Sequence, residues 1–292
     1  MTPPPLQAFL RPAASGGQRL YLHHTPPAGV PTLGALLYLP PWAEEMNKSR
    51  RMAALAARSF ASAGWAVLQI DLLGCGDSSG DFADATWDAW LDDACEAAQW
   101  LVQQHPGVPL WLWGLRAGTL LSAATGARLP FEANHLLWQP ATRGQTVLQQ
   151  FLRIKAAADM ASGQSKTAMA ALRARIEAGQ PVEVAGYTLS PGLLAGLQAA
   201  TLDPPRSGPA PVEHRQRMLW LEVATQPAGE PGPAARTALA AWSHAGWCSA
   251  WHAVQGSPFW QTVEIEEAPA LIDLSLQLLP EERNNARCGG PA

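Results

Sequence analysis

The stretch PLWLWGLRAGTLLSAATGARL, residues 109–129, decides the fold. It begins with an apolar run typical of a buried strand, and its second half is expected to form a helix. Between them, Gly114 and Gly118 bound a turn with the spacing G-x-S-x-G, in which a strained strand-to-helix turn presents a serine hydroxyl above a sheet. The residue in the serine's place is Arg116. The stretch therefore predicts a strand-to-helix turn of this type in which the serine nucleophile is absent.

Strands and helices are expected to alternate on both sides of this turn. Helices are expected over 47–63 and 85–104, after the turn, and within 232–246 and 268–279. Apolar strands are expected at 33–41, 65–74, 109–114, 134–140, 217–223 and 248–256, preceded by an antiparallel hairpin of 6–12 and 18–24. Uniformly apolar strands separated by helices are typical of a parallel sheet covered on both faces. The predicted fold class is α/β, with a mostly parallel central sheet flanked by helices.

The alternation breaks between residues 143 and 212. This segment contains three helical patterns, a short hairpin pattern at VEVAGYTLS and a Pro-rich linker, DPPRSGPAP. We expect it to be a helical lid or cap of residues 143–212 inserted into a core formed by residues 1–142 and 213–292. Such an insertion would cover the edge of the sheet where the strands end, which is where open α/β sheets bind ligands.

Composition excludes several classes of function. The chain has 292 residues, of which 48% are hydrophobic and 15% charged, with a formal net charge of −4 and no Lys/Arg stripe, so nucleic-acid binding is not expected. There is no apolar run of about 18 residues and no signal-peptide pattern, so we expect no membrane span and a cytoplasmic location. The four cysteines form no C-x-x-C pair, and neither a metal site nor an organic cofactor is indicated.

Several sequence blocks resemble one known family. IDLLGCGDSSGDF, residues 70–82, has the D-x-x-G-x-G-x-S pattern common in the α/β-hydrolase superfamily, and YLPPWAEEMNKSRRM occupies the place of that superfamily's oxyanion loop. Together with LWGLRAGTLL, LWQP, VAGYTLSP and PFWQTVEIEEAPALI, the chain resembles the second type of exosortase A system-associated hydrolases of bacterial exopolysaccharide loci. The resemblance runs from Pro40 to Ile272. It implies an α/β-hydrolase fold and work on exopolysaccharide precursors or sorted proteins.

The usual catalytic triad of that superfamily is incomplete in this sequence. Arg116 stays protonated and cannot attack a carbonyl. The segment after the last strand, residues 256–260, holds no histidine, and His252 lies inside the expected strand. Glu222 stands about where the triad acid would be, although a surface or salt-bridged glutamate fits its position equally well. Cys75 lies in a Gly-rich turn with no histidine near it in sequence, which is typical of a small loop residue.

The ends of the expected strands carry aromatic and amide side chains that suit a ligand. Tryptophan offers flat apolar area and one N–H donor for sugar rings, acyl chains or protein side chains. Glutamine adds donors and acceptors, and core packing is the alternative role for each tryptophan. The ligand-binding candidates are Trp42, Leu115, Trp138, Gln139, Trp260 and Gln261.

Arg116 has two alternative roles at this edge. It can form a half-buried ion pair with Glu45, which would plug the old active site, or it can bind a ligand's carboxylate or phosphate at the helix N-terminus. The first function hypothesis is therefore a lidded accessory protein that binds a small-molecule, acyl or saccharide ligand. The alternative is a hydrolase of acyl esters, thioesters or acylated saccharides, with Glu45 or Glu222 as base and Arg116 as oxyanion stabiliser. A third is a structural partner for another protein of the same exopolysaccharide locus.

Overall fold

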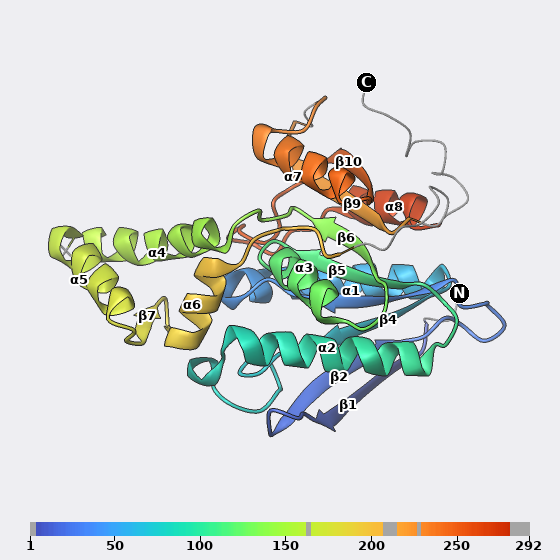
Figure 1. The fold of residues 1–292 in the computed structure, drawn as a ribbon, viewed down its shortest axis with the longest axis horizontal. Coiled ribbons are helices and arrows are strands. Elements are labelled where there is room, and N and C mark those ends of the chain that lie inside the picture. Colours follow the sequence, from blue (N-terminus) through green and yellow to red (C-terminus); the bar gives the residue numbers. More distant parts are fainter. Residues whose placement is uncertain (1–3, 162–164, 207–214, 227–228, 281–292) are drawn as a thin grey trace.

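One eight-stranded sheet organises the chain, whose computed structural model describes residues 4–161, 165–206, 215–226 and 229–280 (Figure 1). The strand order is β1-β2-β4-β3-β5-β6-β9-β10. Neighbouring strands from β4 to β10 are parallel, whereas β1 pairs with β2, and β2 with β4, in the antiparallel sense. The strands are β1 (Leu6–Pro12), β2 (Gln18–His24), β3 (Gly34–Leu39), β4 (Trp65–Ile70), β5 (Leu110–Leu115), β6 (Asn134–Trp138), β9 (Arg217–Ala224) and β10 (Cys248–Gln255).

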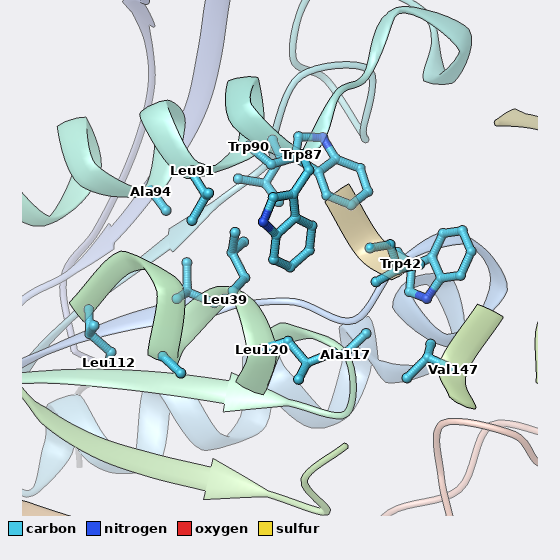
Figure 2. Packing of buried hydrophobic residues seen from close by; sticks show 14 of the residues in the cluster. Leu39, Trp42, Trp87, Trp90, Leu91, Ala94, Leu112, Ala117, Leu120 and Val147 are labelled. Atoms are coloured by element: carbon cyan, nitrogen blue, oxygen red, sulfur yellow. The ribbon is translucent and has the colours of Figure 1, made fainter. Parts of the chain in front are cut away.

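Helices cover both faces of this sheet and form two hydrophobic cores. The helices are α1 (Ala43–Ser62), α2 (Trp87–Gln104), α3 (Gly118–Arg128), α7 (Pro233–His244) and α8 (Pro269–Leu278), with a 3-10 turn, η1 (Phe82–Asp84). One core lies between the sheet and α2, α3 and α7, and the other lies between the sheet and α1 and α8. Figure 2 shows part of the first core, with Leu112 of β5 and Leu120 of α3 facing Leu91 and Ala94 of α2. The prediction of a mostly parallel sheet flanked by helices is confirmed.

Alternation along the strands decides which core each side chain enters. On β5, Leu110 and Leu112 belong to the core on the α2 face, whereas Trp111, Trp113 and Leu115 belong to the core on the α1 face. This two-residue period is the geometric consequence of the pleated strand. Both faces are apolar, which explains why the strands read as continuous hydrophobic runs.

Residues between β6 and β9 form additional elements on one side of the sheet. They are α4 (Gly144–Ala161), α5 (Ser165–Glu177), the hairpin of β7 (Val182–Val184) and β8 (Tyr187–Leu189), and α6 (Pro191–Ala199). In Figure 1, α4 and α5 extend away from the main body of strands and helices. The division into a core and a lid at residues 143–212 stays a prediction. None of the helices in the described part of the chain is long and apolar enough to cross a bilayer.

The first helix begins earlier than the sequence pattern indicates. The expected start was near Asn47, but α1 begins at Ala43, with Trp42 as the residue before it. Glu44 and Glu45 lie in the first helical turn, where their charges interact favourably with the positive end of the helix dipole. Glu44 and Glu45, which were expected in a loop, therefore lie in the first turn of a helix.

Candidate functional site

The turn between β5 and α3 has the constrained geometry that its glycine spacing predicts. Arg116 has φ of +53°, a left-handed conformation that is unusual for a residue with a side chain. A Cβ on Gly118 would lie 2.1 Å from the carbonyl oxygen of Leu39, and one on Gly114 would lie 2.7 Å from the carbonyl oxygen of Gly118. Only glycine allows backbones to approach this closely. The elbow is therefore present, and arginine occupies its apex.

Backbone hydrogen bonds hold the elbow in place. The Arg116 amide donates to the carbonyl oxygen of Trp138 at 3.0 Å. The hydroxyl of Thr119 donates to the carbonyl oxygen of Arg116 at 2.6 Å and accepts the amide N–H of Ala141 at 3.2 Å. The apex is thus bonded to the end of β6 and to the segment that follows it.

The Arg116 guanidinium lies among three side chains from distant parts of the sequence. Its Nε donates to Glu45 Oε1 at 3.1 Å, and its Nη2 lies 3.1 Å from the same oxygen. Nη2 also donates to Gln150 Oε1 at 3.1 Å, which links the elbow to α4. The guanidinium carbon lies 5.6 Å from the ring centroid of Trp260, within range of a cation–π interaction. The ion pair between Arg116 and Glu45 that the sequence suggested is present.

Glu45 is held in an environment that disfavours its charge. Burial raises the pKa of its carboxyl group, and the charge and hydrogen bond of Arg116 oppose that rise. Oε1 is bonded to Arg116, but Oε2 is buried without a hydrogen-bond partner among the described residues. A carboxyl group with a raised pKa and one unused oxygen is suited to accept a proton.

These groups line a pocket of about 670 Å³ at the edge of the sheet. Six of the predicted site residues lie along it: Trp42, Glu45, Arg116, Gln139, Trp260 and Gln261. They come together because parallel strands place their carboxyl ends at the same edge. The ion pair does not fill this pocket but forms one of its walls.

The structure places Leu115, Trp138 and Glu222 elsewhere. Leu115 and Trp138 are the last residues of β5 and β6, and their side chains enter the core on the α1 side of the sheet. There Trp138 donates its indole N–H to Ser275 Oγ at 2.9 Å. Glu222 accepts the indole N–H of Trp220 at 2.7 Å and does not line the pocket. Strand alternation explains Leu115 and Trp138, because a side chain that enters a core layer cannot face the sheet edge.

Five residues of the pocket were not among the predicted site residues. Glu44 and Lys48 lie on α1, next to Glu45 or one turn from it. Val147, Gln150 and Phe151 come from α4. Their spacing of three and four residues is the only local signal of a common helix face, and it does not say which partner that face meets.

The nucleophile and histidine base of a Ser-His-Asp triad are absent from the described wall of the pocket. Its described lining contains no serine, cysteine or histidine. His252 is half-buried on β10, where its backbone aligns with Leu221 of β9. Burial raises the pKa of the Cys75 thiol to about 12, so this cysteine is not a thiolate at neutral pH. Nor do the described residues contain a group of three His, Cys, Asp or Glu side chains that could hold a metal ion.

Comparison with known proteins identifies the fold. Residues 46–176 match the model of the family described as "Serine aminopeptidase, S33". No curated protein sequence matches the chain. Among solved structures, Est1E from Butyrivibrio proteoclasticus with ferulic acid bound is similar with a TM-score of 0.62 and 12% identity, covering 94% of this chain and 99% of that one.

Two further solved structures are similar to this chain over most of its length. The α/β hydrolase GrgF from Penicillium sp. sh18 has a TM-score of 0.56 and 15% identity over 97% of this chain and 99% of that chain. XC6422 from Xanthomonas campestris, described as an α/β serine hydrolase without lid, has a TM-score of 0.54 and 16% identity over 95% and 94%. The chain has the α/β-hydrolase fold.

Proposed function

We propose that this chain uses the α/β-hydrolase fold to bind a small-molecule ligand of acyl or saccharide character, without a serine nucleophile. The observation that carries the proposal is the elbow itself. Its apex holds Arg116 in the strained backbone conformation that would present a nucleophile, and the guanidinium is bonded to Glu45 beneath Trp260. A cation in this position can anchor a ligand but cannot form an acyl-enzyme.

The shape of the pocket supports binding. A cavity of about 670 Å³ is in the range of ligand sites for small molecules. Its walls combine the aromatic rings of Trp42, Phe151 and Trp260 with the amides of glutamine residues. An ion pair that acted only as a plug would leave no such space beside it. We propose that α4 and the elements up to α6 cover this pocket as a lid, since Val147, Gln150 and Phe151 of α4 form part of its wall.

The test is an assay of purified protein against acyl esters, thioesters and acetylated saccharides. Wild type, Arg116→Ala and Glu45→Ala are compared, and ligand binding is followed in parallel by saturation-transfer NMR. The proposal predicts binding of at least one compound class by wild type, loss of that binding in Arg116→Ala, and no turnover above buffer. Circular dichroism establishes that each variant is folded.

Arg128→Ala is the matched control. Arg128 pairs with Asp88 and Asp92 on α2 and does not line the pocket, so its loss removes a cation without touching the site. Binding that survives in Arg116→Ala as well as in Arg128→Ala would contradict the proposal. Turnover by wild type that falls by orders of magnitude in both Arg116→Ala and Glu45→Ala would show instead that the chain is an enzyme.

That second function, a hydrolase with a non-serine mechanism, is favoured by one observation. Glu45 has a raised pKa and a buried oxygen, Oε2, without a hydrogen-bond partner among the described residues. In this alternative the carboxylate takes a proton from water as the water oxygen bonds to the acyl carbon, Arg116 stabilises the oxyanion, and the alcohol or thiol leaves with the proton. Glu222 is a poor candidate for this base because its carboxylate is bonded to Trp220, outside the pocket.

The resemblance of several sequence blocks to exosortase A system-associated hydrolases supports a cellular setting for this binding function. We propose that the chain is a cytoplasmic accessory protein of an exopolysaccharide locus, and that its ligand is an intermediate of that locus or a group on another of its proteins. Co-purification of the tagged chain with proteins of such a locus, reduced by Arg116→Ala only when ligand is present, would support a ligand-dependent partner.

A further inference from the structure

Two of the three glutamine side chains that line the pocket, Gln139 and Gln150, have fixed orientations. Gln139 follows the end of β6, and its Oε1 accepts the backbone N–H of Val223 at 2.8 Å. Gln150 Oε1 accepts a guanidinium N–H of Arg116 at 3.1 Å. A backbone amide and a guanidinium can only donate, so each glutamine must use its oxygen there. Both side chains are therefore left with their NH₂ groups for the pocket.

Arg116 also has hydrogen-bond donors that no described protein group uses. Its Nε and Nη2 are bonded to Glu45 and Gln150, and no hydrogen-bond partner from the described residues meets its Nη1. The Arg116 side chain is 15% exposed and lines the pocket, so these N–H groups can reach a ligand. Gln150 is bonded to Arg116 directly, and Gln139 immediately follows Trp138, which accepts the Arg116 backbone amide. The donors of Gln150 and Arg116 are therefore adjacent, and Gln139 lines the same pocket.

The rest of the wall limits what this donor set can hold. Trp42, Val147 and Phe151 form an apolar part, in which the rings of Trp42 and Phe151 lie 4.7 Å apart. Figure 2 shows Trp42 and Val147 at the opposite end of the drawn side chains from Leu112.

The charged side chains that line the pocket disfavour the binding of a doubly charged anion. They are the two carboxylates Glu44 and Glu45 and the two cations Lys48 and Arg116. The Lys48 ammonium donates one hydrogen bond to the carbonyl oxygen of Val263 at 2.8 Å, which holds it near that carbonyl. A dianionic phosphate would be repelled by the two carboxylates more strongly than a single carboxylate would be, and the N–H donors left on Nη1 of Arg116 suit one carboxylate oxygen.

From this arrangement we infer that the ligand is a monocarboxylate with a flat or chain-like apolar body. Its carboxylate is held by Arg116 and the NH₂ groups of Gln139 and Gln150, and its body lies against Trp42, Val147 and Phe151. This inference rests on the proposed function, because it specifies the ligand of the same pocket. The chain then discriminates an acid from its neutral ester or amide, which a serine hydrolase site with a preference for esters would not do.

The probes are matched pairs that differ only in charge. Cinnamate is compared with cinnamamide, and octanoate with octanamide, by isothermal titration calorimetry at pH 7 with wild-type protein. Neutral saccharides and acyl esters are titrated alongside. We expect the carboxylate of a pair to bind at least tenfold more tightly than its amide.

Substitutions of Gln150 and Arg116 test whether these residues donate hydrogen bonds to the carboxylate. Gln150→Glu keeps an oxygen for Arg116 but replaces the NH₂ group by a negative charge, and its position on the surface of α4 spares the core. We expect Gln150→Glu and Arg116→Gln each to weaken carboxylate binding at least tenfold, so that the acid loses its advantage over the amide. Arg128→Gln, outside the pocket, should bind as wild type does.

Each other outcome overturns the inference. Equal binding of acid and amide, or carboxylate binding that neither variant weakens, would contradict it. If only neutral saccharides or esters bind, and do so in an Arg116-dependent manner, the monocarboxylate inference fails while the proposed function stands. If no compound binds, both fail.

Discussion

Replacing Gly118 by alanine tests the elbow on which the position of Arg116 depends. A Cβ at this residue would lie 2.1 Å from the carbonyl oxygen of Leu39 and 2.6 Å from that of Pro40. Both contacts are with backbone, so no side chain can rotate away. Separating them requires the end of β3 and the start of α3 to move apart by more than about 1 Å, which we expect to cost about 3 kcal/mol of unfolding free energy.

The assay is urea unfolding of wild type, Gly118→Ala and Gly232→Ala. Gly232 is the matched control because an added Cβ there meets no atom within 4 Å and its φ of −64° suits alanine. Since the displaced segment leads into Trp42 and Glu45, Gly118→Ala should also lose ligand binding. Unfolding free energies of Gly118→Ala and wild type that agree within 0.5 kcal/mol, which is about the scatter expected of neutral surface changes, would refute the reasoning.

Arg116→Ser restores a hydroxyl at the elbow, but a fluorophosphonate should not label it, because no histidine lines the described pocket to take its proton; rapid labelling would contradict this. Glu222→Gln should leave ligand binding within about twofold of wild type, since the side chain is bonded to Trp220; a tenfold loss measured by calorimetry would place Glu222 in the site after all. Burial, together with the charges of His105 and His24, lowers the pKa of His23 from 6.5 to about 4, so its contribution to stability is complete above pH 6.5 and is lost as the pH falls towards 4. Unfolding free energy should therefore drop by about 2 kcal/mol more between pH 7 and pH 5 in wild type than in His23→Gln, and equal drops would exclude this histidine as the cause.

The fold was predictable because its signals are local and repeated. Apolar strands, helices between them and the close-packed Gly114 and Gly118 require little knowledge of tertiary contacts. Much of the pocket wall followed from the same topology, since the ends of parallel strands meet at one edge. That rule placed Arg116, Gln139 and Trp260 along the same pocket without any knowledge of distances.

The rest of the site depends on features that local sequence does not contain. A strand's last residue faces either a core or the edge, and a shift of one position exchanges the two, as Leu115 and Trp138 show. Gln150 and Phe151 reach the pocket because of how α4 packs, which is a tertiary property. The orientation of the Gln139 amide depends on a bond to Val223, more than 80 residues away in the sequence.

The central claim is that Arg116 turns a catalytic elbow into a ligand anchor. The most direct test places ethyl cinnamate and cinnamate together with wild-type protein and records NMR spectra over time. Saturation transfer to cinnamate, absent in Arg116→Gln, with the ester consumed no faster than in buffer, is the predicted result. Conversion of the ester to the acid by wild type, abolished in Glu45→Ala and Arg116→Gln, would contradict the claim and make this chain a hydrolase.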